Sequence, residues 1–579
     1  MSGWSRVVRG RSSTWARCLA LALVVAFVGC REGGSSASSG TPSAAVTPHG
    51  DRLTQATISD PKTFNPILVT DAASGDVLRD VFEGLVRFNP FKSEIEPLLA
   101  ERWEFSDDGK QCTFHLRRDV RWHDGVPFSA ADVAFTFDAV YDPKVPNSSK
   151  YVLMVDDQPI RAEVVDDYTV RFVLPRPFAP LLFSIGVEIV PKHILAPALA
   201  DGTFTQKWGI DTPPESIIGT GPYRMTQYVP GQMVRFRRNP DYWAQDDAGK
   251  RLPYVADRVL LIVSNQDTMY LKFRDGQTDI LWPRPEEVVD LRKRAGVVVK
   301  EVGLDTGTLF VSFNRNPKHY VRDGKRAPAL DWFTDAHFLG AIAHAVDKKS
   351  LIQNALYGFG RASVAEISPE NKLFHNSELK DYDYDLAESR RLLADGGYAV
   401  RDGVLYDPQG NRVEFALHTN AGNQIREKIC SILKEDWEKL GMKVNYKPLD
   451  FPALIEKLDT TYDWDAVLIG FTSSVEPNNG ANFLRSDGNL HIWNPRQEKP
   501  ATEWEATIDR LLDEGTRRLE IDKRRPLYWR IQEILHRELP IVLTVYQTRF
   551  VAYRSSVEGY QPTVWSPGVY RPELIRIAE

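Results

Sequence analysis

The chain has 579 residues, of which 42% are hydrophobic and 26% are charged, a balance typical of folded proteins large enough for more than one core. The formal net charge of −6 at pH 7 argues against a nucleic-acid partner, because such a partner requires a basic face. No segment after residue 50 approaches the roughly 20 consecutive apolar residues of a membrane span, so this part of the chain is expected to be water-soluble.

The first 30 residues have the pattern of an export signal. A basic, acid-free start is followed by an unbroken apolar run at 19–28 and then by Gly29 and Cys30. A run of about ten apolar residues suits a signal peptide and is too short to span a bilayer, which disfavours the alternative of a transmembrane anchor. Residues 27–30, Phe-Val-Gly-Cys, resemble the lipobox of bacterial lipoproteins, with Phe27 where Leu is usual. The resemblance implies that Cys30 is diacylated and becomes the mature N-terminus.

Residues 31–50 are predicted to be a flexible tether. Gly, Ser, Ala, Thr and Pro dominate this stretch and it contains no aromatic residue, so it cannot bury enough apolar surface to fold. An acyl anchor followed by a tether is typical of a domain that works in water beside a membrane. The expected location is therefore the periplasm or the cell envelope.

Three short patterns in the first third of the chain predict local structure. Apolar residues in 77–85 recur at helical spacing and predict a helix that ends near the last of them. The sequence Asp-Asp-Gly-Lys at 107–110 predicts a hairpin whose glycine takes the left-handed conformation. Ser129 and Asp132 form a capping box and predict the start of a helix. The region from about 90 to 210 is expected to mix hairpins and helices as an α+β unit.

The best-defined unit lies between about 413 and 470. An alternating segment predicts a half-buried strand, an apolar stripe at 425–440 predicts a helix, and two further strands follow. The strand–helix–strand order implies a mainly parallel sheet covered by helices. Ligands of such sheets bind beyond the carboxyl ends of the strands. The loop from Gly470 to Phe483 is therefore the first candidate for a binding site.

Patterns for catalysis or for a metal site are largely absent from the sequence. There is no Walker A loop, H-E-x-x-H or G-x-S-x-G, and the histidines lack paired spacing, so no metal and no cofactor are expected. Cys112 and Cys430 are expected to be buried free thiols. Ser431 and Lys434 match the S-x-x-K of penicillin-binding enzymes, but they lie within the predicted helix and no K-T-G completes the set. An envelope hydrolase that uses Ser431 is kept as a second hypothesis.

Several blocks of sequence together carry a resemblance to one family. They are Asp80–Leu85, Pro97–Trp103, Asp107–Lys110, Phe114–Arg117, Val120–Gly125, Pro127–Val133, Gly219–Tyr223, Asn239–Trp243, Ala345–Asp347 and Leu392–Tyr398. In their order and spacing, with near-full coverage of the chain, they resemble the bacterial extracellular solute-binding proteins of family 5. These proteins serve ABC importers of peptides, nickel and related solutes.

The resemblance implies an α/β, two-lobed periplasmic-binding-protein-like fold of type II. Mixed sheets flanked by helices form the lobes, a hinge joins them, and an extra subdomain is typical of this large class. Closure of the lobes on a ligand produces the shape that the importer recognises. Mapped onto this chain, lobe I is expected at 51–88, 210–307 and 528–579, the extra α+β subdomain at 89–209, and lobe II at 308–527.

The resemblance further implies that the protein is the substrate-binding component of an ABC importer and not an enzyme. It is expected to capture a peptide or a similar polar oligomer in the cleft and to deliver it to a membrane permease. It is expected to act as a monomer, without a cofactor. An oligosaccharide-binding member of the same fold and a ligand sensor without transport are alternatives that the sequence leaves open.

Two places outside the predicted loop are candidate ligand contacts. The turn at 82–85 matches a segment that lines the cleft in relatives, which puts Glu83 and Gly84 near the ligand; a solvated carboxylate is the alternative for Glu83. Trp282 follows a predicted short strand and is a candidate stacking platform, with core packing as the alternative.

In the loop itself, the family pattern is kept at one position and changed at another. Peptide binders of the family carry an aromatic residue after the glycine and then an aspartate, which pairs with the α-ammonium of the ligand. Here the aromatic residue is Phe471, but the aspartate position is Ser474. Glu476 is a possible substitute for that charge, whereas the hydroxyls of Thr472 and Ser473 suit an oligosaccharide equally well.

Overall fold

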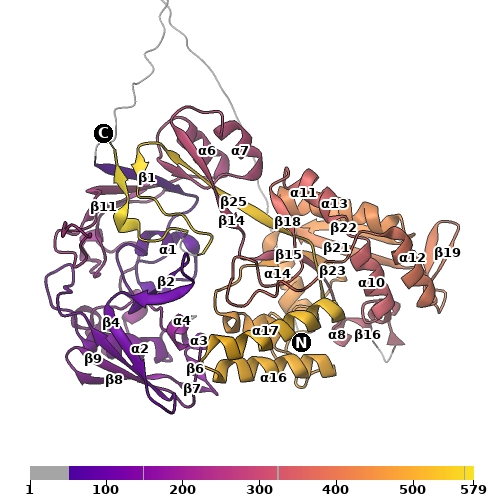
Figure 1. The fold of residues 1–579 in the computed structure, drawn as a ribbon, viewed down its shortest axis with the longest axis horizontal. Coiled ribbons are helices and arrows are strands. Elements are labelled where there is room, and N and C mark those ends of the chain that lie inside the picture. Colours follow the sequence, from indigo (N-terminus) through magenta and orange to yellow (C-terminus); the bar gives the residue numbers. More distant parts are fainter. Residues whose placement is uncertain (1–50, 148, 323–324, 566–567, 579) are drawn as a thin grey trace, which may run out of the picture. The chain divides into compact units, whose positions relative to one another are not determined.

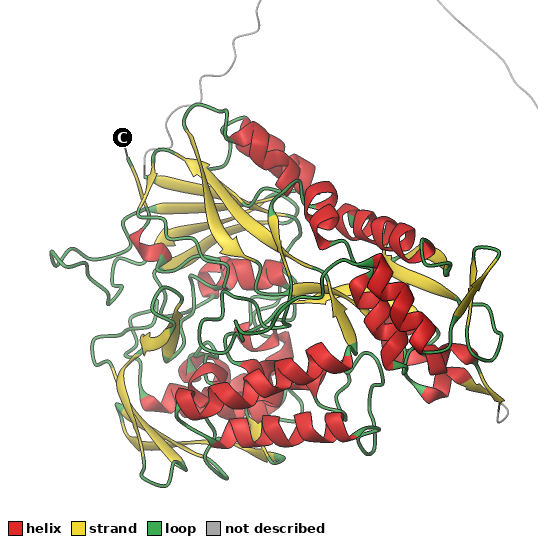
Figure 2. Ribbon diagram, turned by 45° about the vertical axis from the view of Figure 1, so that its right-hand side comes forward, coloured by secondary structure: helices red, strands yellow, loops and turns green. Residues whose placement is uncertain are grey.

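The protein is described here by a computed structural model that covers residues 51–147, 149–322, 325–565 and 568–578. The predicted signal peptide, the predicted tether and Cys30 lie outside these residues. Within the described ranges, no helix is long and apolar enough to cross a membrane. The chain forms several mixed sheets with helices packed against them, as Figures 1 and 2 show.

A four-stranded sheet forms the centre of the first lobe. It joins the first described strand, at residues 52–57, to a strand about 200 residues further along the chain. β1 pairs in parallel with β12, and β11 lies antiparallel to both β12 and β10. A short hairpin, β2 and β3, and the helix α1 follow β1 in the chain. The elements are β1 (Arg52–Thr57), α1 (Ala72–Leu78), β2 (Val86–Asn89), β3 (Glu94–Pro97), β10 (Tyr223–Val229), β11 (Met233–Arg238) and β12 (Asp257–Ile262).

The helix predicted to end near residue 85 ends earlier, at Leu78. After it, the carbonyls of Asp80 and Val81 accept hydrogen bonds from the backbone N–H groups of Tyr223 and Gly221, at 3.0 and 2.9 Å. A Cβ on Gly219 would stand 1.8 Å from the Val81 carbonyl oxygen, so the two segments can approach this closely only because glycine is present. The prediction was wrong because these long-range contacts use backbone groups that a continuing helix would need.

The α+β unit between residues 100 and 204 has a sheet in the order β4-β5-β9-β8, covered by helix α2. The predicted hairpin is confirmed, with Gly109 at φ 66°, and so is the capping box of Ser129 and Asp132. Buried residues of this unit and of the first lobe belong to one continuous hydrophobic core. The elements are β4 (Ala100–Phe105), β5 (Gln111–Leu116), α2 (Ala130–Tyr141), β8 (Arg161–Asp166), β9 (Thr169–Val173) and α5 (Lys192–Asp201).

A five-stranded sheet in the order β22-β21-β23-β15-β24 forms the centre of the second lobe. β21 pairs in parallel with both β22 and β23, as the strand–helix–strand pattern predicts. β15 is antiparallel to its neighbours β23 and β24, so the sheet is mixed. The strands are β15 (Thr308–Phe313), β21 (Glu414–Asn420), β22 (Lys443–Leu449), β23 (Ala466–Phe471) and β24 (Ile541–Leu543).

Alternate residues of the central strands pack against helices on opposite faces of this sheet. Phe313 and Leu468 belong to a core with α10, α12 and α13, whereas Phe310 and Ile469 belong to a core with α16 and α17. Figure 2 shows the last two helices side by side along the lower part of the molecule. The helices are α10 (Ala336–His344), α12 (Leu386–Asp395), α13 (Gln424–Glu438), α16 (Glu503–Arg517) and α17 (Ile521–Glu538).

The chain crosses between the lobes at two places that lie next to each other (Figure 1). Residues 305–307 join β14 to β15, and Thr544 joins β24 to β25. The backbone N–H of Asp305 donates to the carbonyl of Gln547 at 2.7 Å, which ties the two crossings together. β25 pairs with β13, β14 and β18, which are β13 (Ile280–Leu281), β14 (Val297–Leu304), β18 (Gly360–Ala362) and β25 (Val545–Arg554).

The positions of these crossings bear on the predicted domain bounds. The bound at 308 coincides with the first residue of β15. The bound at 528 falls inside α17, whose buried residues pack against the five-stranded sheet. The chain therefore leaves that sheet only after Leu543, the end of β24.

Candidate ligand-binding cavity

A cavity of about 1090 Å³ lies beside the two crossings and is lined by both lobes. The crossing at 305–307 contributes Asp305 and Thr306 to its wall, and β25, which continues the other crossing, contributes Arg549. Further parts of the wall come from α1, β1, β2, β11, β12, Phe183 and Trp282 of the first lobe, from β15, the segment after β18 and the loop after β23, and from residues 563–565 and 568. A cavity of this size can enclose a ligand larger than a single amino acid.

Aromatic side chains form much of the cavity wall. Three of them, Phe310, Phe471 and Phe483, contact one another with ring centroids 5.3 to 5.7 Å apart. Flat rings of this kind can stack on sugars, peptide planes or aromatic groups. The aromatic residues that line the cavity are Phe88, Phe183, Phe236, Trp282, Phe310, Phe471, Phe483 and Trp565.

The loop predicted as a binding site lines this cavity. Phe471 is the last residue of β23, Thr472, Ser473 and Ser474 follow it directly, and all four line the cavity. Backbone packing is close there, because a Cβ on Gly307 would stand 2.1 Å from the carbonyl oxygen of Phe471. The loop is thus held against the crossing between the lobes.

Ser474 offers a neutral hydroxyl where peptide binders of the family carry an aspartate. Its Oγ accepts a hydrogen bond from Asn479 Nδ2 at 3.0 Å, which leaves the hydroxyl one donor and one further lone pair for a ligand. A neutral hydroxyl at this position suits a carbonyl or hydroxyl of the ligand and does not neutralise the charge of an ammonium group.

Glu476, the possible substitute for the missing aspartate, is committed to a buried ion pair. Its carboxylate is fully buried and accepts from both terminal nitrogens of Arg524, with Nη1 to Oε2 at 2.9 Å. The same carboxylate accepts from the backbone N–H of Asn478 at 3.1 Å, and Arg524 Nε donates to the carbonyl of Gly515. Glu476 therefore holds the loop against α17, and its charge is already compensated.

The other charged residues of the cavity wall are paired, with one exception. Arg79 pairs with Asp76, Arg258 with Asp80, and Arg549 with Asp305 at 3.7 Å. Glu366 also lines the cavity, but its Oε1 is closed off from solvent and has no hydrogen-bond partner among the described residues. Sequence reasoning missed Glu366 because no local pattern marks it; only the fold brings it to the cavity.

Trp282 lines the cavity and also packs against a small apolar cluster, so both of its predicted roles are compatible with its place. The guanidinium of Arg549 lies 5.8 Å from the centre of its ring. A Cβ on Gly568 would stand 3.3 Å from the ring, which shows how closely the C-terminal segment covers it. One face of Trp282 is thus occupied by the protein itself.

Glu83 and Gly84 are not brought to this cavity, which corrects the expectation that they lie near its ligand. Glu83 is buried, with 6% of its surface exposed, and it accepts hydrogen bonds from Tyr242 Oη at 2.8 Å and Trp243 Nε1 at 3.3 Å. Burial raises the pKa of its carboxyl to about 7. A Cβ on Gly84 would stand 3.3 Å from the carbonyl oxygen of Val187, so this turn is packed inside the first lobe. The early end of α1 redirects the turn into that core.

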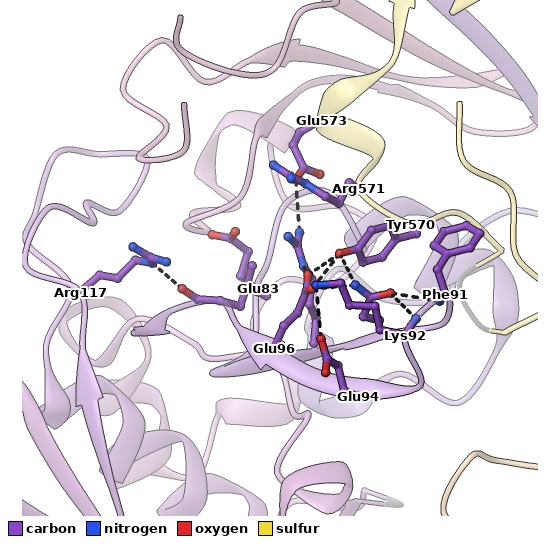
Figure 3. A network of polar contacts seen from close by, with 12 residues as sticks. Glu83, Phe91, Lys92, Glu94, Glu96, Arg117, Tyr570, Arg571 and Glu573 are labelled. Carbon is purple, nitrogen blue, oxygen red and sulfur yellow. Dashed lines mark hydrogen bonds and ion pairs between the residues drawn. The ribbon is translucent and has the colours of Figure 1, made fainter. Parts of the chain in front are cut away.

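A polar network beside Glu83 ties the C-terminal segment to the β2–β3 hairpin (Figure 3). Arg87 donates to Glu96 at 2.5 Å and to Glu573 at 3.2 Å, and Tyr570 Oη donates to Glu96 at 2.7 Å. These contacts fix residues 570–573 next to the first lobe.

Ser431 and Lys434 do not contact each other in the way that an activated serine nucleophile requires. Ser431 is exposed on α13, and its hydroxyl donates to the carbonyl of Glu427 at 3.0 Å. The ammonium of Lys434 pairs with Glu438 instead of with Ser431. Within the described ranges, no group of three or more His, Cys, Asp or Glu side chains is placed to hold a metal ion. Cys112 and Cys430 are buried free thiols, as predicted.

This fold and this cavity define a two-lobed binding protein, and comparison with known proteins places it in a family. Residues 94–490 match the family model of bacterial extracellular solute-binding proteins, family 5. The chain belongs to this family, as its sequence blocks indicate.

Individual relatives agree with this membership. The chain is 27% identical to heme-binding protein A of Haemophilus influenzae over 93% of its own length and 95% of the relative. It is 26% identical to the dipeptide-binding protein of Escherichia coli over 86% and 90% of the two chains. Among solved structures, the ABC transporter substrate-binding protein CtaP of Listeria monocytogenes superimposes with a TM-score of 0.76 at 22% identity, covering 92% of this chain and all of that chain. The oligopeptide-binding protein AppA of Bacillus subtilis, solved with a nonapeptide, superimposes with a TM-score of 0.69 at 22% identity and the same coverage.

The burial of Glu83 predicts a specific pH dependence of stability. The pKa of its carboxyl is about 7 in the folded state and 4.5 in the unfolded chain, so the folded state holds the proton more tightly between these values. Its contribution to stability is fully present below pH 4.5 and is lost as the pH rises through 7. On account of Glu83, the free energy of unfolding is expected to fall by up to about 3 kcal/mol over this interval.

Urea unfolding of the wild type and of Glu83→Gln, at pH values of about 5 and about 7.5, measures this contribution. Glu83→Gln should show the smaller fall in stability, while Glu435→Gln, the same change at an exposed position of α13, should behave as the wild type. An identical pH dependence in all three proteins would contradict the assignment.

The ion pair of Glu476 and Arg524 yields a second prediction. Glu476→Gln leaves the buried guanidinium of Arg524 without a countercharge, so we expect a loss of about 3 to 5 kcal/mol in the free energy of unfolding. Chemical denaturation of the ligand-free protein measures this loss, with Ser474→Ala as the control in the same loop. Unchanged stability in Glu476→Gln would show that the carboxylate is available for a ligand after all.

Proposed function

We propose that the protein is the extracytoplasmic substrate-binding component of an ABC importer, which captures a peptide or a similar polar oligomer and delivers it to a membrane permease. The observation that carries this proposal is the cavity of about 1090 Å³ at the two crossings, lined by both lobes. Membership of the solute-binding family and relatives named for dipeptide and heme binding support it.

The lining of the cavity fits an extended ligand with both apolar and polar parts. Aromatic rings offer stacking surfaces, and the hydroxyls of Thr472, Ser473 and Ser474 offer hydrogen bonds. Because Ser474 is neutral, an oligosaccharide is the second candidate ligand for the same cavity. The two candidates share the stacking surfaces and differ in the charge that they bring.

Delivery to a permease requires that the liganded protein differ in shape from the empty one. A ligand shifts a protein between open and closed states only if it binds one of them more tightly. The two adjacent crossings are the segments about which the lobes can turn, and a ligand that contacts both walls favours closure. We propose that the protein does this as a monomer.

A lipid anchor at Cys30 completes the proposal. Diacylation after signal-peptide cleavage would attach the protein to a membrane, and the tether at 31–50 would keep the binding domain free in the periplasm or cell envelope. Two acyl chains are enough for stable attachment, because each buried CH₂ contributes about 0.8 kcal/mol.

A ligand screen tests the proposed capture function. A protein starting at residue 31 is heated with di- to pentapeptides, cello- and xylo-oligomers and nickel chelates, and its melting temperature is recorded. A ligand at about 100 times its Kd is expected to add about 2.7 kcal/mol of stability. Phe471→Ala should weaken the response to the same ligand, because it removes a ring from the wall.

Stabilisation by peptides selects the main proposal, and stabilisation by neutral oligosaccharides selects the second candidate. A screen in which no compound stabilises the wild type would count against capture of this class of solutes.

Fractionation of cells that express the full chain tests the anchor. Cys30→Ser is expected to move the protein from the membrane fraction to the soluble fraction, because the acylated thiol is lost. Cys18→Ser, within the predicted leader, is the matched control and should stay with the membrane. Membrane retention of Cys30→Ser would favour the alternative of a transmembrane anchor.

A further inference from the structure

We infer that Glu366 is a subsite of the cavity for a cationic group, so that the preferred ligand carries an ammonium group. This inference rests on the proposed function and names the ligand chemistry of the same cavity. In peptide binders of the family, the carboxylate that pairs with the ammonium group lies in the loop after β23. In this protein, the corresponding carboxylate would lie in the segment that follows β18.

The pairing of charges around the cavity singles out Glu366. Four carboxylates line the wall, and three of them have an arginine partner: Asp76 pairs with Arg79, Asp305 with Arg549, and Glu476 with Arg524. Arg258 on the same wall is paired with Asp80, which lies outside it. Glu366 is left as the one lining carboxylate for which the described residues provide neither an ion pair nor a hydrogen bond to Oε1.

The backbone around Glu366 is held firmly by its neighbours. Tyr546 of β25 donates its hydroxyl to the carbonyl of Ala365, and His375 lies with Nδ1 2.7 Å from the carbonyl oxygen of Ile367. Three residues before Glu366, Ser363 accepts a hydrogen bond from Thr308 Oγ1 at 2.8 Å. The segment that carries the carboxylate is therefore fixed to both β15 and β25. Binding of a ligand costs little conformational entropy here, because the segment is already ordered.

A carboxylate with one enclosed, unpartnered oxygen is poorly compensated by the protein alone. Burial raises the pKa of the Glu366 carboxyl to about 7, because the charged form has lost water and a hydrogen bond from its own backbone N–H offsets only part of that loss. A ligand ammonium supplies the missing donors and the opposite charge at once. The same ammonium has no charged partner at Ser474, and Glu476 is already engaged by Arg524.

Aromatic rings on the wall of the same cavity strengthen the preference for a cation. Ile367, next to Glu366, belongs to the same core as Phe310, and Phe310 contacts both Phe471 and Phe483. Ring faces attract ammonium groups as well as apolar ones. A neutral oligosaccharide can use these rings but leaves the Glu366 carboxylate uncompensated.

Calorimetric titration with paired probes tests the inference. The probes are tetra-alanine amide and its N-acetyl form, which differ in one ammonium group, together with spermidine and cellotetraose. We expect the wild type to bind tetra-alanine amide at least about tenfold more tightly than the acetylated form. Glu366→Gln should lose this discrimination by weakening the free amine alone, and Glu366→Asp should restore part of it.

Glu435→Gln on the exposed face of α13 is the matched control and should keep the wild-type affinities. Discrimination that persists unchanged in Glu366→Gln overturns the inference, and so does a wild type that binds neither tetra-alanine amide nor spermidine. If the wild type binds neither cation but does bind cellotetraose, the proposed capture function is supported and the cationic subsite is rejected. A melting curve of each ligand-free variant verifies that it is folded.

Discussion

The pair of crossings between the lobes is the constraint on which the rest of the structure depends. Residues 305–307 and Thr544 pass between the same two sheets, and the hydrogen bond from Asp305 to Gln547 holds them together. β25 continues one crossing and pairs with strands from three distant parts of the chain. Because the cavity lies at these crossings, any change of angle between the lobes changes its wall directly.

The electrostatics of the cavity follow from this arrangement. Each lobe compensates most of its own charges internally, as Arg258 with Asp80 and Glu476 with Arg524 illustrate. Burying such pairs costs desolvation energy, but each pair fixes the positions of its two side chains. They therefore shape the wall without offering an uncompensated charge to a ligand. Glu366 differs because the segment that carries it is fixed by backbone contacts and not by its own side chain. Positive charge in a ligand therefore meets one defined acceptor in an otherwise balanced, aromatic wall.

Local patterns predicted local structure well where the hydrogen bonds join residues that are close in sequence. The capping box at Ser129 and the glycine turn before β5 involve residues only a few positions apart, and both were confirmed. The helical stripe that became α13 and the strands around it were also recognisable, because one face of each is buried. The end of α1 was not recognisable, since the carbonyls of Asp80 and Val81 are used by Gly221 and Tyr223, far along the chain.

The sequence by itself determined the family and the two-lobed class of fold, because these depend on ordered motifs, and the strand end before Thr472 predicted a loop that lines the cavity. Only the tertiary structure decided which polar groups are free to meet a ligand. Glu83 matched a cleft segment of the family yet is enclosed by Tyr242 and Trp243, and Glu476 is neutralised by Arg524. Glu366 carries no motif at all. Whether a carboxylate is paired depends on residues brought together from distant segments, and a linear pattern contains no record of that pairing.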